Sequence, residues 1–188
     1  MREIDEGLIL PQTIGEFVMS LISVTLPDGT VNEYAAGITC SEVIIDALGK
    51  KNGCVAALVD GHERDMSYEL LDSCMIEGIK AESDAGMYIL RHSTAHLLAQ
   101  AVVELYPNAK PTIGPPVDRG FYYDFAMEPL LESDLKAIHK KMQEIARRNL
   151  TLERVELDEA ELREHFASNP YKLEIIEDKV GAGSGSTI

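Results

Sequence analysis

The amino-acid sequence predicts an α+β protein, with a strand-rich N-terminal part and a helix-rich C-terminal part. Three observations lead to this class. Apolar and polar residues alternate in LISVTL (21–26), which is the period of a half-buried strand. Residues 87–106 have helical character and stop at Pro107. Residues 135–150 place apolar side chains at helical spacing along one side. A chain of 188 residues with 45% hydrophobic residues allows one ordinary domain or two small ones.

The pattern of residues 20–83 is that of a small module with a β-grasp arrangement. The first strand is followed by Pro27-Asp28-Gly29, a turn signal in which glycine accepts a positive φ. Thr39 or Ser41 can cap a helix that ends before Gly49. Two strands, one helix and further strands in this order indicate a β-grasp arrangement. The expected elements are strands at 21–26, 30–34, 54–59 and 73–79 and a helix through Leu48.

Residues 84–188 predict a second α+β domain, built on a central helix and a mixed or antiparallel sheet. Residues 82–86 are rich in turn-forming types and mark the boundary. Asp158 can cap a short further helix. The other expected elements are strands at 120–125 (GFYYDF), 150–157 (LTLERVEL) and 171–177 (YKLEIIE), then a flexible tail at 181–186. A domain seldom ends on such a loop, so we expect a fragment.

Composition and charge exclude several classes of protein. The net charge of −15, from 17 basic and 32 acidic residues, disfavours non-specific binding to DNA. No apolar run approaches the ~18 residues of a membrane span, and no signal peptide is apparent. The three cysteines are widely spaced and predict buried thiols in a reducing compartment. We expect a cytoplasmic protein without membrane contact. Residues 1–19 form an acidic leader that need not be native, because translation can also begin at Met19.

RHSTAHLL (91–98) places His92 and His96 four positions apart on the long predicted helix, so they share one face. An apolar stripe on nearly the opposite face is formed by Leu90, Leu97, Ala101 and Leu105. The histidine face also carries Ala99 and Val103, which indicates a central helix. We therefore expect the histidines to line a cavity with restricted water, where imidazoles can orient water or move protons.

Other interpretations of the histidine pair remain. A pair of surface histidines fits the H-x-x-x-H spacing equally. A zinc protease is disfavoured because Ser93 stands where H-E-x-x-H requires glutamate. Two histidines are also too few for a stable zinc site. We expect no metal here.

The 135–150 helix is a candidate contact for a phosphate backbone. Residues 133–150 carry five basic residues against two acidic ones in a strongly acidic chain. A solvated helix face is the simple alternative. The cations are Lys136, Lys140, Lys141, Arg147 and Arg148.

Taken together, these segments resemble one known family. ISVTLPDGTVNEYAAGITCSEVI (22–44) with GCVAALVDG (53–61) is similar to a TGS domain, a ubiquitin-like β-grasp module. The segment from LRHSTAHLL to GFYYDF (90–125) resembles the start of the editing domain of threonyl-tRNA synthetases, and NPYKLEIIE (169–177) resembles a later part. A TGS module alone also occurs in stringent-response factors and some GTPases. The combination with H-x-x-x-H and GFYYDF is specific to this synthetase family.

The resemblance implies a domain organisation and a set of partners. Residues 1–19 would be the leader, 20–83 the TGS domain and 84–188 an editing domain that stops before its Cys-x-x-x-His half. The class II core, which uses ATP, Mg and Zn to attach threonine to tRNA, would also lie outside the chain. We therefore expect no cofactor in this fragment and no aminoacylation by it. Its partner would be tRNA, and the intact family enzyme is typically a homodimer.

The resemblance also maps the editing pocket onto particular residues. His92, His96 and Lys172 match its catalytic positions. Tyr122, Tyr123 and Asp124 are candidate substrate-binding residues of the pocket wall, although ordinary strand residues fit equally. The pocket would hydrolyse seryl-tRNA. Serine differs from threonine only in lacking one methyl group, and a binding site gains only about 1–3 kcal/mol of discrimination from such a group. Two alternatives are a non-catalytic RNA- or protein-binding TGS module and a free-standing deacylase.

Overall fold

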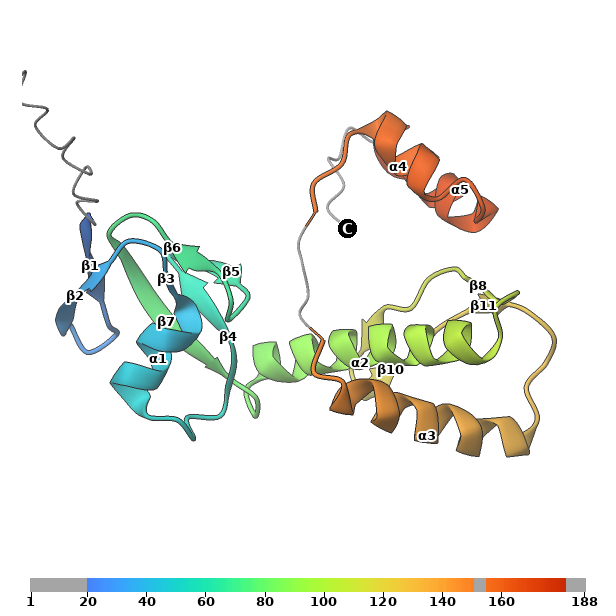
Figure 1. The fold of residues 1–188 in the computed structure, drawn as a ribbon, viewed down its shortest axis with the longest axis horizontal. Helices are drawn as coiled ribbons and strands as arrows, with labels where there is room; N and C mark the ends of the chain where they lie inside the picture. The colour runs from blue at the N-terminus through green and yellow to red at the C-terminus, as the bar shows by residue number, and fades with distance from the viewer. Residues whose placement is uncertain (1–19, 151–154, 182–188) are drawn as a thin grey trace, which may run out of the picture. The chain divides into compact units, whose positions relative to one another are not determined.

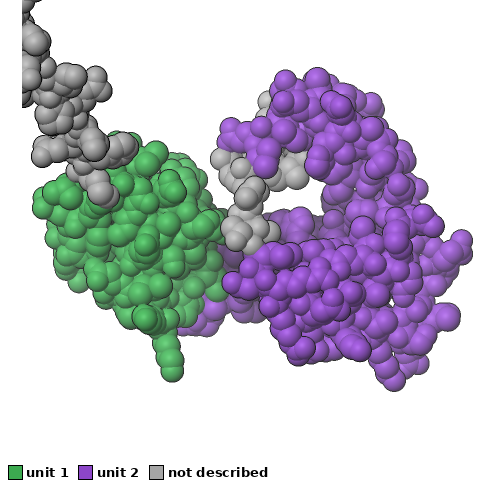
Figure 2. All heavy atoms as spheres, in the orientation of Figure 1, with its two compact units in different colours: residues 1–80 green, residues 81–188 purple. Residues whose placement is uncertain are grey.

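The computed structural model describes residues 20–150 and 155–181, and the predicted leader and tail lie outside these residues. The chain divides into two compact units, residues 1–80 and 81–188 (Figure 2). The described residues contain a mixed five-stranded sheet, three two-stranded pairs and five helices, so the predicted α+β class is confirmed. None of these helices combines the length and the apolar character that a membrane crossing requires.

The first unit is built on the five-stranded sheet, in the order β2-β1-β7-β4-β5 (Figure 1). Its central pair, β1 and β7, is parallel, whereas β1 with β2, β4 with β7 and β4 with β5 are antiparallel. The strands are β1 (Leu21–Thr25), β2 (Val31–Ala35), β4 (Cys54–Val59), β5 (His62–Arg64) and β7 (Cys74–Lys80). The short strands β3 (Ile38–Thr39) and β6 (Glu69–Leu70) form a separate pair.

Helix α1 (Cys40–Leu48) begins with a reciprocal cap. The Thr39 hydroxyl accepts from the Glu42 N–H at 3.3 Å, and the Glu42 carboxylate accepts from the Thr39 N–H at 2.9 Å. Gly49 ends the helix at φ 84°, a conformation that glycine adopts without steric cost. Of the two caps that the sequence allowed, Thr39 is the one used.

The core of the first unit lies between α1 and the sheet. Val24, Cys40 and Val43 have no exposed surface. Burial raises the pKa of the Cys40 thiol to about 11, so this cysteine is a small apolar core residue, as expected. The buried cluster consists of Ile22, Val24, Cys40, Val43, Ile44, Ala57, Val59, Leu70 and Ile76.

The second unit is organised around α2 (Asp84–Leu105), which packs along α3 (Glu132–Arg147), as Figure 1 shows. Ser83 caps α2 by accepting from the Gly86 N–H at 3.1 Å. The core between the two helices consists of Ala101, Val102, Ala109, Ile138 and Ile145. Both predicted helices are confirmed, and each begins three residues earlier than its apolar pattern indicated.

The predicted single strand at 120–125 is wrong. Gly120–Phe121 (β10) pairs with Pro116–Val117 (β9), whereas Phe125–Ala126 (β11) pairs with Lys110–Pro111 (β8). The chain therefore changes partner within GFYYDF, and the described strands of this unit form antiparallel pairs rather than one sheet. Prolines limit each pair, because they cannot donate to a strand ladder.

The predicted strand at 171–177 is also wrong, because α5 (Pro170–Gly181) occupies these residues. Proline suits the first helical position, where its missing N–H is not needed. The backbone N–H groups of Lys172 and Leu173 donate to the Asn169 carbonyl and close the first turn. The short helix after Asp158 is confirmed as α4 (Glu159–His165). Of the predicted strand at 150–157, residues 151–154 lie outside the described part and 155–157 are not a strand.

Candidate functional site

The two histidines of α2 contact one another. His92 and His96 lie one helical turn apart, with their Nε2 atoms at 3.0 Å and their ring centroids at 4.7 Å. One ring therefore donates and the other accepts, which a neutral imidazole pair can do. Tyr88, one turn earlier, stacks on His92 with centroids 6.5 Å apart. The predicted common face is therefore realised as a hydrogen-bonded pair.

A cavity of about 410 Å³ adjoins this pair. Four segments of the second unit enclose it: α2, the loop at 112–116, Tyr123 and the α4–α5 region. Both histidines remain exposed, so the cavity is more open than the sequence led us to expect. Its lining consists of Tyr88, His92, His96, Thr112, Ile113, Gly114, Pro115, Pro116, Tyr123, Phe166, Lys172, Ile175, Ile176 and Lys179.

The cavity is an electropositive region of an acidic protein. Its described lining includes two lysines and two histidines but no carboxylate, although the chain has 32 acidic residues. Although His96 keeps an exposed surface, partial desolvation of its ring is the main cause that lowers its pKa, and His92 and Lys172 lower it further. Burial, together with Lys179, also lowers the pKa of Lys172. This setting favours a neutral His96 near pH 7 and an anionic or electron-rich ligand.

The structure brings four of the predicted site residues to this cavity. His92, His96, Lys172 and Tyr123 line it. Tyr122 and Asp124 do not belong to its lining, and both side chains are exposed. The backbone of Asp124 instead exchanges hydrogen bonds of 2.9 Å with Thr112 and Ile113. Among the described residues, no group of three or more His, Cys, Asp or Glu side chains could hold a metal ion.

Several lining residues were not identified from the sequence. Ile175, Ile176 and Lys179 follow the predicted Lys172 at helical spacing, a signal that the strand interpretation of this segment concealed. Phe166 belongs to the end of α4. The sequence of the loop that contains Gly114 has no local pattern that would predict a cavity wall.

Gly114 lets the ring of Tyr123 pack against the backbone, because a Cβ atom there would overlap the ring. We expect Gly114→Ala to displace Tyr123 from the cavity wall and to destabilise the second unit by about 1–3 kcal/mol, the usual range for overpacking. Urea denaturation and the near-ultraviolet circular dichroism of the tyrosines would measure this. Gly29→Ala is the control: it strains a turn at φ 86° in the first unit without such a contact, so it should lower stability but leave the environment of Tyr123 unchanged. An unchanged tyrosine signal in Gly114→Ala would contradict the prediction.

The five cations of the α3 region separate into two groups. Arg148 donates to both carboxylate oxygens of Glu104 at 2.8 and 2.9 Å and to Glu144 at 2.8 Å. Lys141 lies 3.1 Å from Glu144 and 3.8 Å from Glu104. These two cations connect α3 to α2. Within the described residues, Lys136, Lys140 and Arg147 are exposed and make no ion pair.

Arg148→Ala should reduce thermal stability at neutral pH. Hydrogen bonds from Arg148 are the largest cause that lowers the pKa of both Glu104 and Glu144. A carboxylate with a lowered folded-state pKa stabilises the fold above its unfolded pKa and loses this contribution as the pH falls through the folded pKa. The melting temperatures of wild type and variant should therefore converge as the pH falls below about 4. The two melting temperatures should also converge in 1 M NaCl, because salt screens the attraction between exposed charges. Arg147→Ala is the matched control, and a difference independent of pH would argue against the ion pairs.

Sequence comparisons place the chain among the aminoacyl-tRNA synthetases. It is 46% identical to the threonine–tRNA ligase of Thermobifida fusca over 159 residues, which is 84% of this chain and 24% of that protein. It is 52% identical to the Streptomyces griseus threonine–tRNA ligase over 131 residues, 69% of this chain and 20% of the relative. For the Rubrobacter xylanophilus threonine–tRNA ligase the identity is 42% over 161 residues, 84% of this chain and 25% of the relative.

The chain belongs to the threonine–tRNA ligase family, and the similarity covers the N-terminal part of those proteins. It spans about a quarter of the length of the curated relatives that it matches. No model of a known protein family matches the chain.

Proposed function

We propose that this chain is the N-terminal part of a threonine–tRNA ligase and that residues 84–188 contribute to hydrolysis of mischarged seryl-tRNA. The observation that carries the proposal is the hydrogen-bonded histidine pair, at 3.0 Å, beside a cavity that also receives Lys172 and contains no described carboxylate. Its volume of about 410 Å³ is within the usual range for small-ligand sites. A terminal ribose with its seryl ester is a ligand of this size.

The groups in the cavity can divide the work of ester hydrolysis. His92 and His96 hold the terminal ribose and a water molecule near the ester carbonyl. Neutral His96 accepts a proton as that water attacks and returns it to the ribose oxygen as the bond between the seryl carbonyl carbon and this oxygen breaks. Lys172 stabilises the negative charge that develops on the carbonyl oxygen. A free ribose hydroxyl can assist, so neither histidine has to be the sole base. Tyr123 forms part of the wall, and pocket size would discriminate against the additional methyl group of threonine.

The first test is selective hydrolysis. The protein encoded by the complete reading frame around this chain should release serine from seryl-tRNA faster than it releases threonine from threonyl-tRNA. Radiolabelled amino acid measured over time gives both rates. Serine release no faster than in buffer would overturn the proposed function.

Further proposals concern the longer protein. We expect the reading frame beyond Ile188 to encode a Cys-x-x-x-His motif and a class II core that uses ATP, Mg and Zn, in a cytoplasmic homodimer. The first unit would be its TGS domain. The mixed sheet with a parallel central pair and one packed helix supports a β-grasp assignment. A natural stop at residue 188 would instead favour a non-catalytic binding module, and a Cys-x-x-x-His without the core would favour a free-standing deacylase.

The exposed cations of α3 are the proposed contact with the tRNA backbone. Lys136, Lys140 and Arg147 recur at helical spacing on one exposed face, whereas Lys141 and Arg148 are occupied by carboxylates. Replacing all three with glutamine should weaken tRNA binding and reduce the slope of log K against log salt by about 1 per lost phosphate contact. Filter binding at several salt concentrations measures the slope. Lys50→Gln with Lys51→Gln, in the first unit, is the control. An effect of the control alone would place the RNA contact in the first unit.

A further inference from the structure

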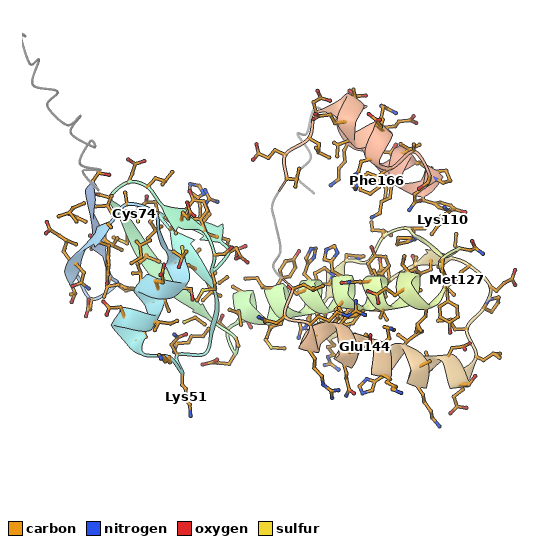
Figure 3. All side chains as sticks on the ribbon, viewed as in Figure 1. Lys51, Cys74, Lys110, Met127, Glu144 and Phe166 are labelled. Atoms are coloured by element: carbon orange, nitrogen blue, oxygen red, sulfur yellow. The ribbon has the colours of Figure 1, made fainter. Side chains whose placement is uncertain are left out.

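The turn between α4 and α5 is fastened to strand β8 by two hydrogen bonds. The Lys110 Nζ atom donates to the Ser168 carbonyl at 2.8 Å. The Asn169 Nδ2 atom donates to the Pro111 carbonyl, also at 2.8 Å. In Figure 3, Lys110 on the strand side and Phe166 on the helix side lie on the facing edges of these two parts. Both hydrogen bonds join residues 58 positions apart in the chain and lie just before α5.

Asn169 is an unusual residue in this contact. Its side chain is polar but only 7% of the residue is exposed, and no other polar or charged residue that the structure describes is buried. A carbonyl can only accept a hydrogen bond, so the amide nitrogen has to face Pro111 and the orientation of the side chain is determined. The remaining oxygen, Oδ1, is buried and has no partner among the described residues. A buried acceptor without a partner destabilises a fold, so stability alone does not account for an asparagine here.

The location of Asn169 points to a role in the site. Lys172 follows three positions later, in the first turn of α5, and its backbone N–H donates to the Asn169 carbonyl at 3.1 Å. Lys172 and the histidines of α2 line the same cavity from different elements. The hydrogen bonds from the α4–α5 turn to β8 therefore help to set the position of the first turn of α5.

We infer that Asn169 is a positioning residue, whose amide holds the first turn of α5 against β8 so that the Lys172 ammonium group stays beside His96. It does not touch the reacting atoms. The inference deepens the proposed function, on which its catalytic meaning depends, but the geometry that it describes can be measured without any hydrolysis. An asparagine suits this role because its short amide reaches the Pro111 carbonyl as a donor, which an aspartate carboxylate cannot do.

The titration of His96 reports this geometry. The titratable groups that face the cavity are Tyr88 and His92 from α2, Tyr123 from the strand region, and Lys172 and Lys179 from α5. Burial, His92 and Lys172, in this order, lower the pKa of His96. If Asn169 holds Lys172 in place, releasing the turn should reduce the contribution of Lys172 and raise the pKa of His96.

The experiment is an NMR titration of His96 in the 188-residue chain, with its resonance assigned by His96→Gln. Lys172→Gln and Asn169→Ala should each raise the pKa of His96 by more than the scatter of repeat titrations. Asn169→Ala should add little further shift in the Lys172→Gln background. Ser168→Ala and Lys140→Gln are controls that should leave this pKa unchanged, because Ser168 contributes its backbone carbonyl and Lys140 is exposed on α3 and does not line the cavity.

Each other outcome overturns the inference. An unchanged His96 pKa in Asn169→Ala would show that Lys172 does not depend on the amide. An equal shift in the presence and absence of Lys172 would show that Asn169 acts through burial of the ring. If Asn169→Ala does not fold, Lys110→Met removes the neighbouring hydrogen bond and has to raise the pKa in the same direction. A positive titration result without any seryl-tRNA hydrolysis would refute the proposed function and leave the positioning role in place.

Discussion

Replacing both His92 and His96 with alanine in the complete protein should lower the rate of seryl-tRNA hydrolysis about 10²- to 10⁴-fold, the range that positioned acid–base groups contribute. The two rings share one hydrogen bond at 3.0 Å, so each single variant should lose most of this factor. Deacylation of seryl-tRNA under single-turnover conditions measures the effect on the chemical step. Aminoacylation with threonine should remain within a few-fold of wild type, because the proposed synthetic core lies outside these residues.

His139→Ala is the matched control for the histidine variants. His139 lies on α3, is exposed, contacts Gln143 at 3.1 Å and does not line the cavity. Its loss should leave deacylation unchanged. Because the pKa of His96 is lowered and the neutral ring is the proposed active form, the rate should rise with pH through this lowered pKa and level off near neutrality. Undiminished hydrolysis in the double variant would remove the histidines from the mechanism.

Replacing Val24 with aspartate should unfold the first unit. Val24 is 0% exposed and lies in β1, between Asn32 of β2 and Cys74 of β7. A carboxylate at this position would be buried among apolar side chains without a partner, which costs more than about 4 kcal/mol and approaches the whole stability of a small unit. Amide hydrogen exchange should show loss of protection throughout β1, β4 and β7. The helices α2 and α3 of the second unit should keep their protection.

Leu21→Asp is the control for charge in the same strand. Leu21 is 67% exposed, three positions earlier and therefore on the opposite face of β1. We expect its stability to change by less than about 0.5 kcal/mol, as is usual for surface positions. Equal destabilisation by the two variants would contradict the strand register, since a slip of one residue exchanges the two faces.

Local patterns in the sequence predicted those elements in which one face is apolar and the ends carry their own signals. The alternation in β1, the turn at Pro27-Asp28-Gly29 and the Thr39 cap all appear in the structure. The spacing of His92 and His96 was sufficient to place both rings on one face of α2. These features depend on neighbouring residues, so a single sequence contains the information for them.

Short apolar runs were ambiguous because their partners lie far away in the chain. YKLEIIE satisfies both a strand and a helix period, and Pro170 with the burial of Ile176 favours the helix. GFYYDF has strand-forming residues throughout, but its two ends pair with different segments. Only Tyr123 of the three candidates in this motif reaches the cavity.

By itself, the sequence determined the α+β class, the principal helices, the resemblance to threonyl-tRNA synthetases and the shared face of the two histidines. The resemblance also predicted that Lys172 joins those histidines. The tertiary structure alone decided that Tyr123, rather than Tyr122 or Asp124, lines their cavity, and that Lys141 and Arg148 are engaged by Glu104 and Glu144. The physical reason is that local periodicity specifies which face of an element is apolar or charged. Which distant segment covers that face depends on packing and on individual hydrogen bonds such as that from Asn169 to Pro111.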